Sequence, residues 1–172
     1  MTSDIYLSLG SNSGDRYAMI GKAVAALTDI YAALNCTVRV AEPITSMPQG
    51  FDSPNPFVNV GVLVNVERPT SWTPLELEAL LGTTQAVERV LSGKPHRNPD
   101  GSYRDREIDV DIIAVDTIEY SSPSLTLPHP RLAEREFVLK PMSQLLPNWV
   151  HPTLGLTPDE MLENLKPSST NK

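Results

Sequence analysis

The chain has 172 residues and only one cysteine, Cys36, so an internal disulfide is excluded. This cysteine lies in an apolar stretch, where we expect a small buried side chain and not a nucleophile. Long apolar runs are also missing, and the first residues lead directly into a predicted strand without a basic segment. We therefore expect a cytoplasmic protein from a reducing compartment that is neither secreted nor bound to a membrane.

An excess of positive charge is lacking too. The net charge is −7 and the isoelectric point is near 4.9, which argues against a nucleic-acid partner, because phosphate contacts need a basic surface. However, seven of the 14 lysines and arginines lie between Arg89 and Arg135, together with His96 and His129. One basic region in an acidic protein is typical of a site for a small polyphosphate.

Two carboxylates, Asp109 and Asp111, lie in the β-branched run 106–113, which predicts a strand. Side chains alternate between the faces of a strand, so these two acids share one face. The apolar residues expected on the core face are Ile108, Val110 and Ile112. Paired carboxylates without a neighbouring cysteine or histidine suit Mg²⁺, which keeps several waters and takes further oxygens from a phosphorylated substrate. The alternative is an exposed edge strand with solvated acids.

The remaining pattern predicts a strand, a helix, two strands, a helix and a strand, followed by further helical segments. The expected ranges are strand 5–9, helix 15–34, strand 37–41, strand 57–66, helix 73–91, strand 106–115, strand 118–120, helix 131–146 and helix 157–165. This order predicts an α+β fold with a ferredoxin-like βαββαβ core, in which helices cover one face of an antiparallel sheet. We expect a single domain over residues 1–166, including a C-terminal extension, and a disordered tail over 167–172.

Three loops connect these elements. Residues 10–14 lack the glycine spacing and the Lys-Ser/Thr pair of a P-loop, so we interpret them as a tight turn from strand to helix. The proline-rich segment 43–56 predicts a binding loop, since an ordered strand follows it directly. The basic segment 92–103, placed just before the acidic strand, predicts a mobile lid.

Two further pairs of residues have a functional and an ordinary interpretation. Phe57 and Asn59 share one strand face beside Gly61 and could bind a flat, hydrogen-bonding heterocycle, although such residues are common in ordinary strands. Gln85 and Glu88 share a helix face, where the alternative is a solvated helix surface.

Five segments resemble, in the same order, one family of folate biosynthesis, the 6-hydroxymethyl-7,8-dihydropterin pyrophosphokinases. These segments are residues 9–12, residues 46–50 with 57–59, residues 85–88, residues 105–111, and residues 127–131 with 135–139. The resemblance covers nearly the whole chain, and it is carried above all by the patterns R-x-x-D-x-D and P-H-P-R-(x)₃-R-x-F-V-L.

The resemblance implies transfer of pyrophosphate from ATP to the 6-hydroxymethyl group of the dihydropterin, which leaves AMP, with the help of two Mg²⁺ ions. It makes Asp109 and Asp111 the metal ligands, and it adds Arg106 and His129 to them as catalytic residues. The expected partners are these two small molecules, with no nucleic acid and no membrane, and we expect a monomer.

The resemblance also assigns two sets of binding residues. The residues expected to bind ATP are Gln85, Glu88, Lys94, His96, Tyr103, Arg106, His129 and Arg135. The residues expected to bind the pterin are Ser46, Pro48, Gln49, Phe57, Asn59 and Phe137, with the two phenylalanines stacked on either side of the ring.

The sequence departs from the better-known members of the family at several of these positions. Ser46 replaces a threonine and Tyr103 replaces a tryptophan, changes that keep a hydroxyl and an aromatic ring. Lys94 and His96 replace arginines, so phosphate binding there would be less bidentate and, at His96, dependent on pH. Residues 98–102 lengthen the loop before the acidic strand.

Two rival functions are compatible with the same residues. One is a different Mg²⁺-dependent nucleotidyl or phosphoryl transferase that uses the acidic pair. The other is a non-catalytic ferredoxin-like module that binds a ligand or a partner protein.

Overall fold

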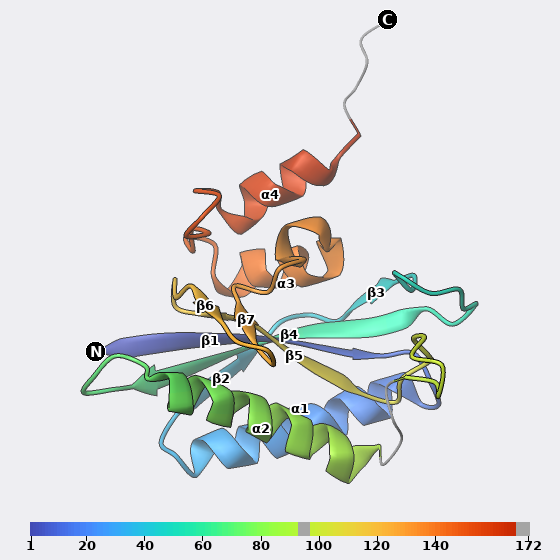
Figure 1. The fold of residues 1–172 in the computed structure, drawn as a ribbon, viewed down its shortest axis with the longest axis horizontal. Coiled ribbons are helices and arrows are strands. Elements are labelled where there is room, and N and C mark those ends of the chain that lie inside the picture. Colours follow the sequence, from blue (N-terminus) through green and yellow to red (C-terminus); the bar gives the residue numbers. More distant parts are fainter. Residues whose placement is uncertain (93–96, 168–172) are drawn as a thin grey trace, which may run out of the picture.

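The computed structural model describes residues 1–92 and 97–167, and its centre is an antiparallel β-sheet (Figure 1). The four main strands lie in the order β2-β4-β1-β5, and β3 pairs with one end of β4. The bounds are β1 Thr2–Ser11, β2 Thr37–Val40, β3 Ile44–Ser46, β4 Phe57–Glu67 and β5 Asp109–Val115. Since β1 and β2 are both antiparallel to β4, they run parallel to each other with β4 between them.

The register of the central strands brings polar residues from distant parts of the chain together. Gly10 of β1 lies opposite Asn59 of β4 on one side and opposite Asp109 of β5 on the other. Ser8 of β1 lies opposite Asp111. One end of the sheet therefore carries the acidic pair of β5 on one side of β1 and Asn59 of β4 on the other side.

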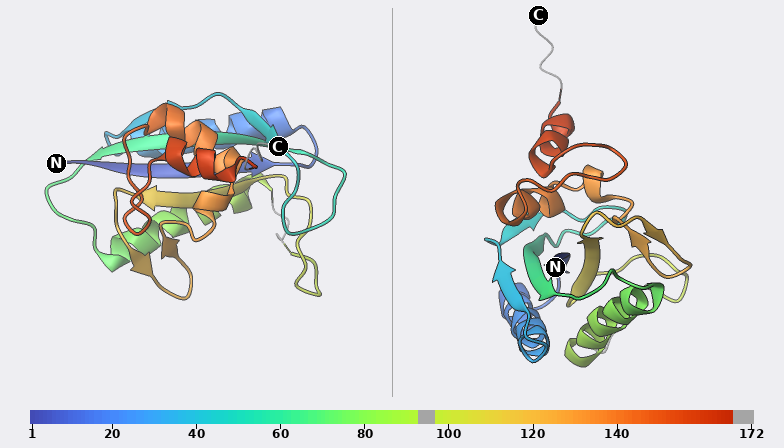
Figure 2. Two further views of the ribbon diagram at one scale, coloured as in Figure 1. Left: turned by 90° about the horizontal axis from the view of Figure 1, so that it is seen from above. Right: turned by 90° about the vertical axis from the view of Figure 1, so that its left-hand side faces the viewer.

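Helices α1 (Arg16–Ala32) and α2 (Pro74–Leu91) cover one face of the sheet, as the sequence predicts (Figures 1 and 2). The Asp15 side chain caps α1 by accepting a hydrogen bond from the amide of Ala18. A capping box between Thr73 and Glu76, with proline next to the cap, begins α2. The core beneath these helices is apolar and includes Ile5, Leu7, Leu9, Leu27, Val58, Val60, Val62, Val64, Leu77, Val87, Ile108, Val110 and Ile112.

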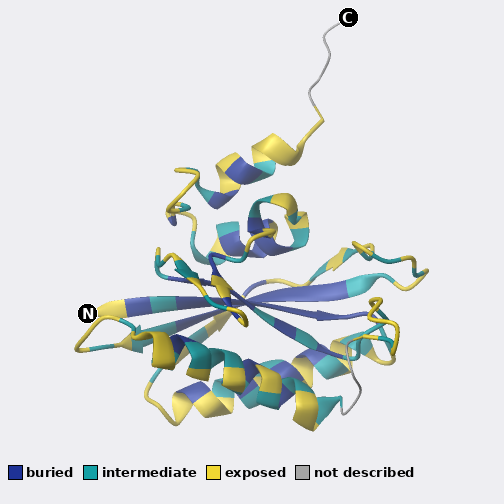
Figure 3. Cartoon of the chain, viewed as in Figure 1, coloured by how far each residue is buried: buried dark blue, intermediate teal, exposed yellow. Residues whose placement is uncertain are grey.

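The opposite face of the sheet is also covered, which corrects the expectation that helices lie on one face only. Helices α3 (Glu136–Leu145) and α4 (Pro158–Leu165) form a further layer there, and Figure 3 shows their buried sides turned toward the sheet and toward each other. This second core contains Tyr6, Ile113, Leu132, Val138, Leu139, Met142, Trp149 and Met161. Tyr6 of β1 and Ile113 and Ala114 of β5 are the residues of these two strands that belong to it.

The predicted continuous helix over 131–146 is wrong. A short 3₁₀ helix, η1 (Leu132–Glu134), is followed by an extended residue, Arg135, with φ −116° and ψ 98°, before α3 begins. The side chain of this extended residue reaches the acidic strand, where its guanidinium lies 3.7 Å from Asp111.

Other boundaries differ in smaller ways. Strand β1 is longer than the predicted 5–9, β3 forms within the predicted loop 43–56, and β5 begins only at Asp109. The segment after β5 forms a small hairpin of β6 (Tyr120–Ser121) and β7 (Thr126–Leu127).

Within the described ranges, none of the helices has the length and apolar character needed to cross a membrane. The predicted tail lies outside the described residues except for Pro167.

Candidate active site

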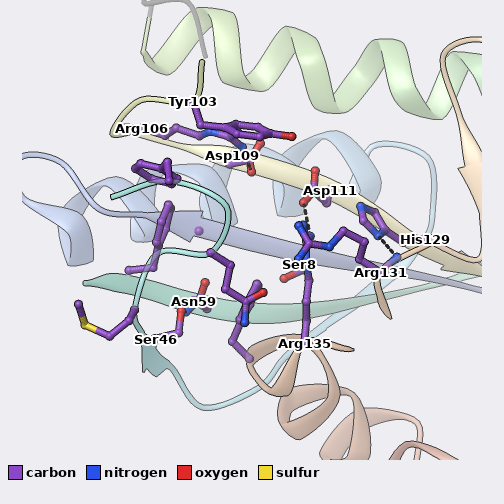
Figure 4. Close-up of a pocket in the computed structure, with 16 residues that line it drawn as sticks. Ser8, Ser46, Asn59, Tyr103, Arg106, Asp109, Asp111, His129, Arg131 and Arg135 are labelled. Atoms are coloured by element: carbon purple, nitrogen blue, oxygen red, sulfur yellow. Dashed lines mark hydrogen bonds and ion pairs between the residues drawn. The ribbon is translucent and has the colours of Figure 1, made fainter. Parts of the chain in front are cut away.

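One pocket lies at the end of the sheet where the acidic pair, β3, β4 and the start of α3 meet (Figure 4). Its lining residues are Ser8, Gly10, Ser46, Met47, Gln49, Phe51, Phe57, Asn59, Tyr103, Arg106, Asp109, Asp111, His129, Arg131, Arg135 and Phe137. The lining is polar and charged beside β5 and aromatic beside β4. The pocket therefore has two chemically different halves.

The charged half is built on the alternation of β5. Asp109 and Asp111 face the pocket, whereas Val110 and Ile112 between and beyond them are buried in the core, as the sequence predicts. Asp109 forms an ion pair with Arg106, and Asp111 Oδ2 lies 3.7 Å from Nη1 of Arg135. Each acid thus has one arginine beside it.

These arginines do not fully offset the cost of placing two carboxylates side by side in the pocket. Burial, together with the negative charge of Asp109, raises the pKa of Asp111 well above its usual value, although Arg135 and Arg106 act in the opposite direction. A cation between the two carboxylates would relieve this cost. Among the described residues no group of three or more histidine, cysteine or acidic side chains could enclose a metal ion. Two carboxylates nevertheless fit Mg²⁺, which is held in many sites by one or two carboxylates, waters and substrate phosphates.

Two arginines of the pocket have unused hydrogen-bonding capacity. The Nε atoms of Arg106 and Arg135 are buried, and neither has a hydrogen-bond partner within the part of the chain that the structure describes. A buried donor without a partner is costly, so these N–H groups suit the oxygen atoms of an anionic ligand.

His129 completes the charged half. Its backbone amide donates to the carbonyl oxygen of Ile113 on the outer edge of β5 (2.8 Å), and its Nδ1 accepts from the amide of Arg131 (3.1 Å). Burial and the charge of Arg135 lower the pKa of His129 to about 4, so the ring is neutral at pH 7. With Nδ1 acting as an acceptor, the proton of the neutral ring is on Nε2, which is a hydrogen-bond donor.

The other half of the pocket combines aromatic rings with an amide. Phe57 and Phe137 both line it, and Phe51 packs edge-on against Phe57 with ring centroids 6.3 Å apart. The amide nitrogen of Asn59 donates to the carbonyl oxygen of Ile44 (3.2 Å) and to the Ser46 hydroxyl (2.8 Å). Because both amide hydrogens are used, Asn59 can offer a ligand only its oxygen.

Gly10 gives this half of the pocket its shape. A Cβ atom at position 10 would lie 3.2 Å from Oδ1 of Asn59 and 3.3 Å from the Phe57 ring, tighter than ordinary contacts. The absence of a side chain lets both residues lie against β1.

The structure brings most of the predicted site residues together. The pocket includes Ser46, Gln49, Phe57, Asn59, Tyr103, Arg106, Asp109, Asp111, His129, Arg135 and Phe137. Pro48, Gln85 and Glu88 do not line it. Lys94 and His96 lie outside the described residues, as does part of the predicted lid.

The two residues predicted on α2 differ in their surroundings. Gln85 is exposed on the helix surface. Glu88 accepts a hydrogen bond from the amide of Val110 (2.7 Å), so it supports the outer edge of β5 between the two acids. Burial raises the pKa of Glu88 to about 8, with the charges of Asp109 and Asp111 adding to the effect, although the Val110 amide opposes it. The contact of Gln85 and Glu88 with a nucleotide stays a prediction.

Sequence reasoning missed five residues of the pocket. They are Ser8, Gly10, Met47, Phe51 and Arg131. Arg131 lies in the P-H-P-R motif, and Met47 and Phe51 lie in the predicted binding loop. Gly10 lies in segment 9–12, which carries part of the resemblance, whereas Ser8 could be found only from the strand register, which a sequence pattern does not provide.

The fold and the pocket first define a class of protein. It is a mixed α/β protein whose site combines charged side chains suited to a phosphorylated small molecule with aromatic rings suited to a flat ring system. The chain belongs to the 7,8-dihydro-6-hydroxymethylpterin-pyrophosphokinase (HPPK) family, whose model matches residues 6–147.

Similar proteins support this membership. A 2-amino-4-hydroxy-6-hydroxymethyldihydropteridine pyrophosphokinase from Porphyromonas gingivalis is 39% identical over 149 residues, which cover 86% of this chain and 93% of the relative. The protein with the same name from Bacillus subtilis is 34% identical over 145 residues, which cover 84% of this chain and 79% of the relative.

A solved structure supports the fold. The Plasmodium falciparum HPPK-DHPS crystal structure with pteroate superposes with a TM-score of 0.55 and 13% identity, and the match covers 95% of this chain. This chain spans only 42% of that longer chain. At this identity the likeness concerns the fold alone.

Proposed function

We propose that this protein transfers pyrophosphate from ATP to 6-hydroxymethyl-7,8-dihydropterin and releases AMP. The observation that carries the proposal is the division of one pocket into an acidic and arginine-rich half and an aromatic and amide half. Membership of the pyrophosphokinase family and the names of the relatives point to the same reaction. The strand order β2-β4-β1-β5 also supports our inference of a ferredoxin-like core.

The charged half would bind the triphosphate. Asp109 and Asp111 would hold two Mg²⁺ ions, which when bound neutralise phosphate charge and polarise the β-phosphoryl group. Arg106 and Arg135 would direct their buried Nε hydrogens at phosphate oxygens, and neutral His129 would donate from Nε2. These residues would act by positioning and by stabilising negative charge.

The aromatic half would bind the pterin. Phe57 and Phe137 would stack on the bicyclic ring, and the Asn59 oxygen would accept a hydrogen bond from a ring N–H group. With the pterin bound in this way, its hydroxymethyl oxygen would attack the β-phosphorus. One P–O bond forms there, the bond between the β-phosphorus and the oxygen that remains on AMP breaks, and the hydroxyl proton is released.

The direct test is product analysis. The protein is incubated with ATP, Mg²⁺ and 6-hydroxymethyl-7,8-dihydropterin, and the expected products are AMP and the pterin diphosphate. Release of ADP would indicate a different phosphoryl transferase, and release of free pyrophosphate would indicate a nucleotidyl transferase. The absence of any turnover would favour a non-catalytic binding module.

Variants of the acidic pair test the assignment of the charged half. We expect Asp109→Asn and Asp111→Asn each to lower kcat by about 100-fold or more, since each removes a charge that acts at the reacting phosphates. Asp100→Asn is the matched control, because Asp100 is exposed and, among the described residues, its side chain accepts hydrogen bonds from Ser102 of its own turn. Full activity in both acidic variants would contradict the proposal.

A further inference from the structure

A polar cluster beside the pocket has no part in the chemistry proposed above. It consists of Asn12, Ser53, Asn55 and Asp105, and we refer to it as the Asp105 cluster. The Asp105 carboxylate accepts three hydrogen bonds: from Nδ2 of Asn12 (2.8 Å), from Oγ of Ser53 (2.7 Å) and from Nδ2 of Asn55 (2.6 Å). None of the four residues lines the pocket.

The cluster joins three segments that are far apart in the sequence. Asn12 follows β1, Ser53 and Asn55 belong to the loop before β4, and Asp105 precedes β5. Asn12 also forms two hydrogen bonds with the backbone of Arg106. The Asn12 Oδ1 atom accepts from the backbone amide of Arg106 (2.7 Å), and the backbone amide of Asn12 donates to the carbonyl oxygen of Arg106 (3.0 Å). Arg106 therefore keeps its position through Asn12 and through its ion pair with Asp109.

The loop 47–56 is attached at its C-terminal end, where Nδ2 of Asn12 donates to the carbonyl oxygen of Asn55 (3.2 Å) and Nη1 of Arg16 donates to that of Pro56 (2.7 Å). It contributes Met47, Gln49 and Phe51 to the pocket, and Met47 and Gln49 are exposed. Phe51 makes ring contacts with Phe57 and with Tyr103, each at 6.3 Å between centroids. Two of the three hydrogen bonds to Asp105 come from this loop, so Asp105 is its main polar attachment to the segment that carries Tyr103 and Arg106.

The charge of Asp105 suits this role. Burial alone would raise its pKa, but the hydrogen bonds from Ser53, Asn55 and Asn12 outweigh burial and lower it. A carboxylate that stays ionised makes hydrogen bonds about twice as strong as those between neutral groups.

We propose that Asp105 is a positioning residue for the ring-binding half of the pocket, because it fastens the loop 47–56 that supplies Phe51 and Gln49. The identity of the ring rests on the function proposed above. The nucleotide half should depend little on Asp105, since Arg106 keeps both Asn12 and Asp109 when the carboxylate is removed.

Binding measurements on Asp105→Ala test this claim, with Asp100→Ala as the control. Asp100 is also an acid of the segment before β5 and also accepts hydrogen bonds, from the amide and hydroxyl of Ser102, but it does not touch the loop 47–56. With Mg²⁺ and a non-hydrolysable ATP analogue present, we expect Asp105→Ala to raise the Kd for 6-hydroxymethyl-7,8-dihydropterin at least tenfold. The Kd for the analogue alone should change less than twofold, and Asp100→Ala should change neither constant.

A double-variant cycle separates positioning from general damage to the fold. Ser53→Ala with Asn55→Ala should weaken pterin binding as much as Asp105→Ala, and the triple variant should be no weaker. This pair of substitutions leaves Asn12 and Arg106 untouched, so it remains informative if Asp105→Ala does not fold. Additive losses, or equal losses of pterin and nucleotide affinity, would overturn the proposal.

A protease readout tests the loop without any ligand. Chymotrypsin should cleave after Phe51 at least fivefold faster in Asp105→Ala than in the wild type, and no faster in Asp100→Ala. Unchanged cleavage would contradict the role of Asp105 in holding the loop. If the wild type binds no dihydropterin while cleavage responds as expected, the proposed function fails and the attachment of the loop stands.

Discussion

At the scale of single residues, His129 shows how two contacts and a charged neighbour determine a protonation state. Its backbone amide is used on the edge of β5 and its Nδ1 is used by Arg131, so only Nε2 remains for a ligand. Burial and Arg135 keep the imidazole neutral. A neutral donor beside two arginines adds a directional hydrogen bond without adding a further positive charge to a crowded site.

This environment predicts a dependence of stability on pH. The pKa of His129 is lowered from 6.5 to about 4 in the folded protein, so between these values the unfolded chain binds more protons. The free energy of unfolding should therefore be fully retained above pH 6.5 and should fall as the pH decreases toward 4. His129→Asn keeps an acceptor for the Arg131 amide and removes the titration. Because the side chain is partly exposed, we expect the wild type to lose about 1–2 kcal/mol relative to the variant over this range.

Urea unfolding of the ligand-free wild type and of His129→Asn at several pH values between 4.5 and 7.5 measures this effect. The difference between the two proteins is the relevant quantity, because contributions of the carboxylates cancel in it. A difference that does not change with pH would show that His129 has an ordinary pKa in the folded state.

At the scale of elements, close packing of α3 on the sheet depends on a glycine of β4. A Cβ atom at Gly61 would lie 2.3 Å from the Tyr6 hydroxyl oxygen and 2.7 Å from Cβ of Pro141 in α3. The buried Tyr6 hydroxyl in turn donates to the carbonyl oxygen of Val138 (3.1 Å). The sheet and the helix therefore meet at a point with no room for a methyl group.

We expect Gly61→Ala to destabilise the protein by about 1–3 kcal/mol through overpacking. Gly82→Ala on α2 is the control, because nothing lies within 4 Å of an added Cβ there and alanine favours a helix. Adding Tyr6→Phe to Gly61→Ala should recover part of the loss, since the closest clash is with the hydroxyl. The midpoints of urea unfolding are compared for the wild type, the two single variants and the double variant. Equal midpoints for Gly61→Ala and the wild type would contradict this account.

The elements also show what a sequence pattern can and cannot predict. Alternation in 106–113 correctly predicted the buried and pocket-facing sides of β5, and a capping box correctly predicted the start of α2. The break at Arg135 was not predicted, because the local apolar pattern continues across it and does not reveal the contact of Arg135 with Asp111. The pairing of Gly10 with Asn59 and Asp109 is likewise a property of the sheet.

At the scale of the whole molecule, the sheet lies between two helical layers (Figures 1 and 2). The pocket takes residues from four strands and, through Arg135 and Phe137, from the start of α3. The layer of α3 and α4 therefore supports the site as well as the second core. The α3 helix is also fixed to the sheet without α4, through fully buried Val138 and Leu139 and the bond from Tyr6.

This arrangement predicts that α4 contributes to stability more than to catalysis. Met161 of α4 is 1% exposed in the second core, and Met161→Ala should lower the free energy of unfolding by about 2–4 kcal/mol through loss of burial and formation of a cavity. Leu165→Ala is the control on the same helix, where the side chain is 39% exposed and the expected loss is smaller. Well below its melting temperature, Met161→Ala should keep kcat and both KM values within about twofold, since Arg135 and Phe137 are positioned by contacts nearer the sheet. A large rise in the KM for the pterin in a folded Met161→Ala variant would show instead that α4 holds Phe137 in the pocket.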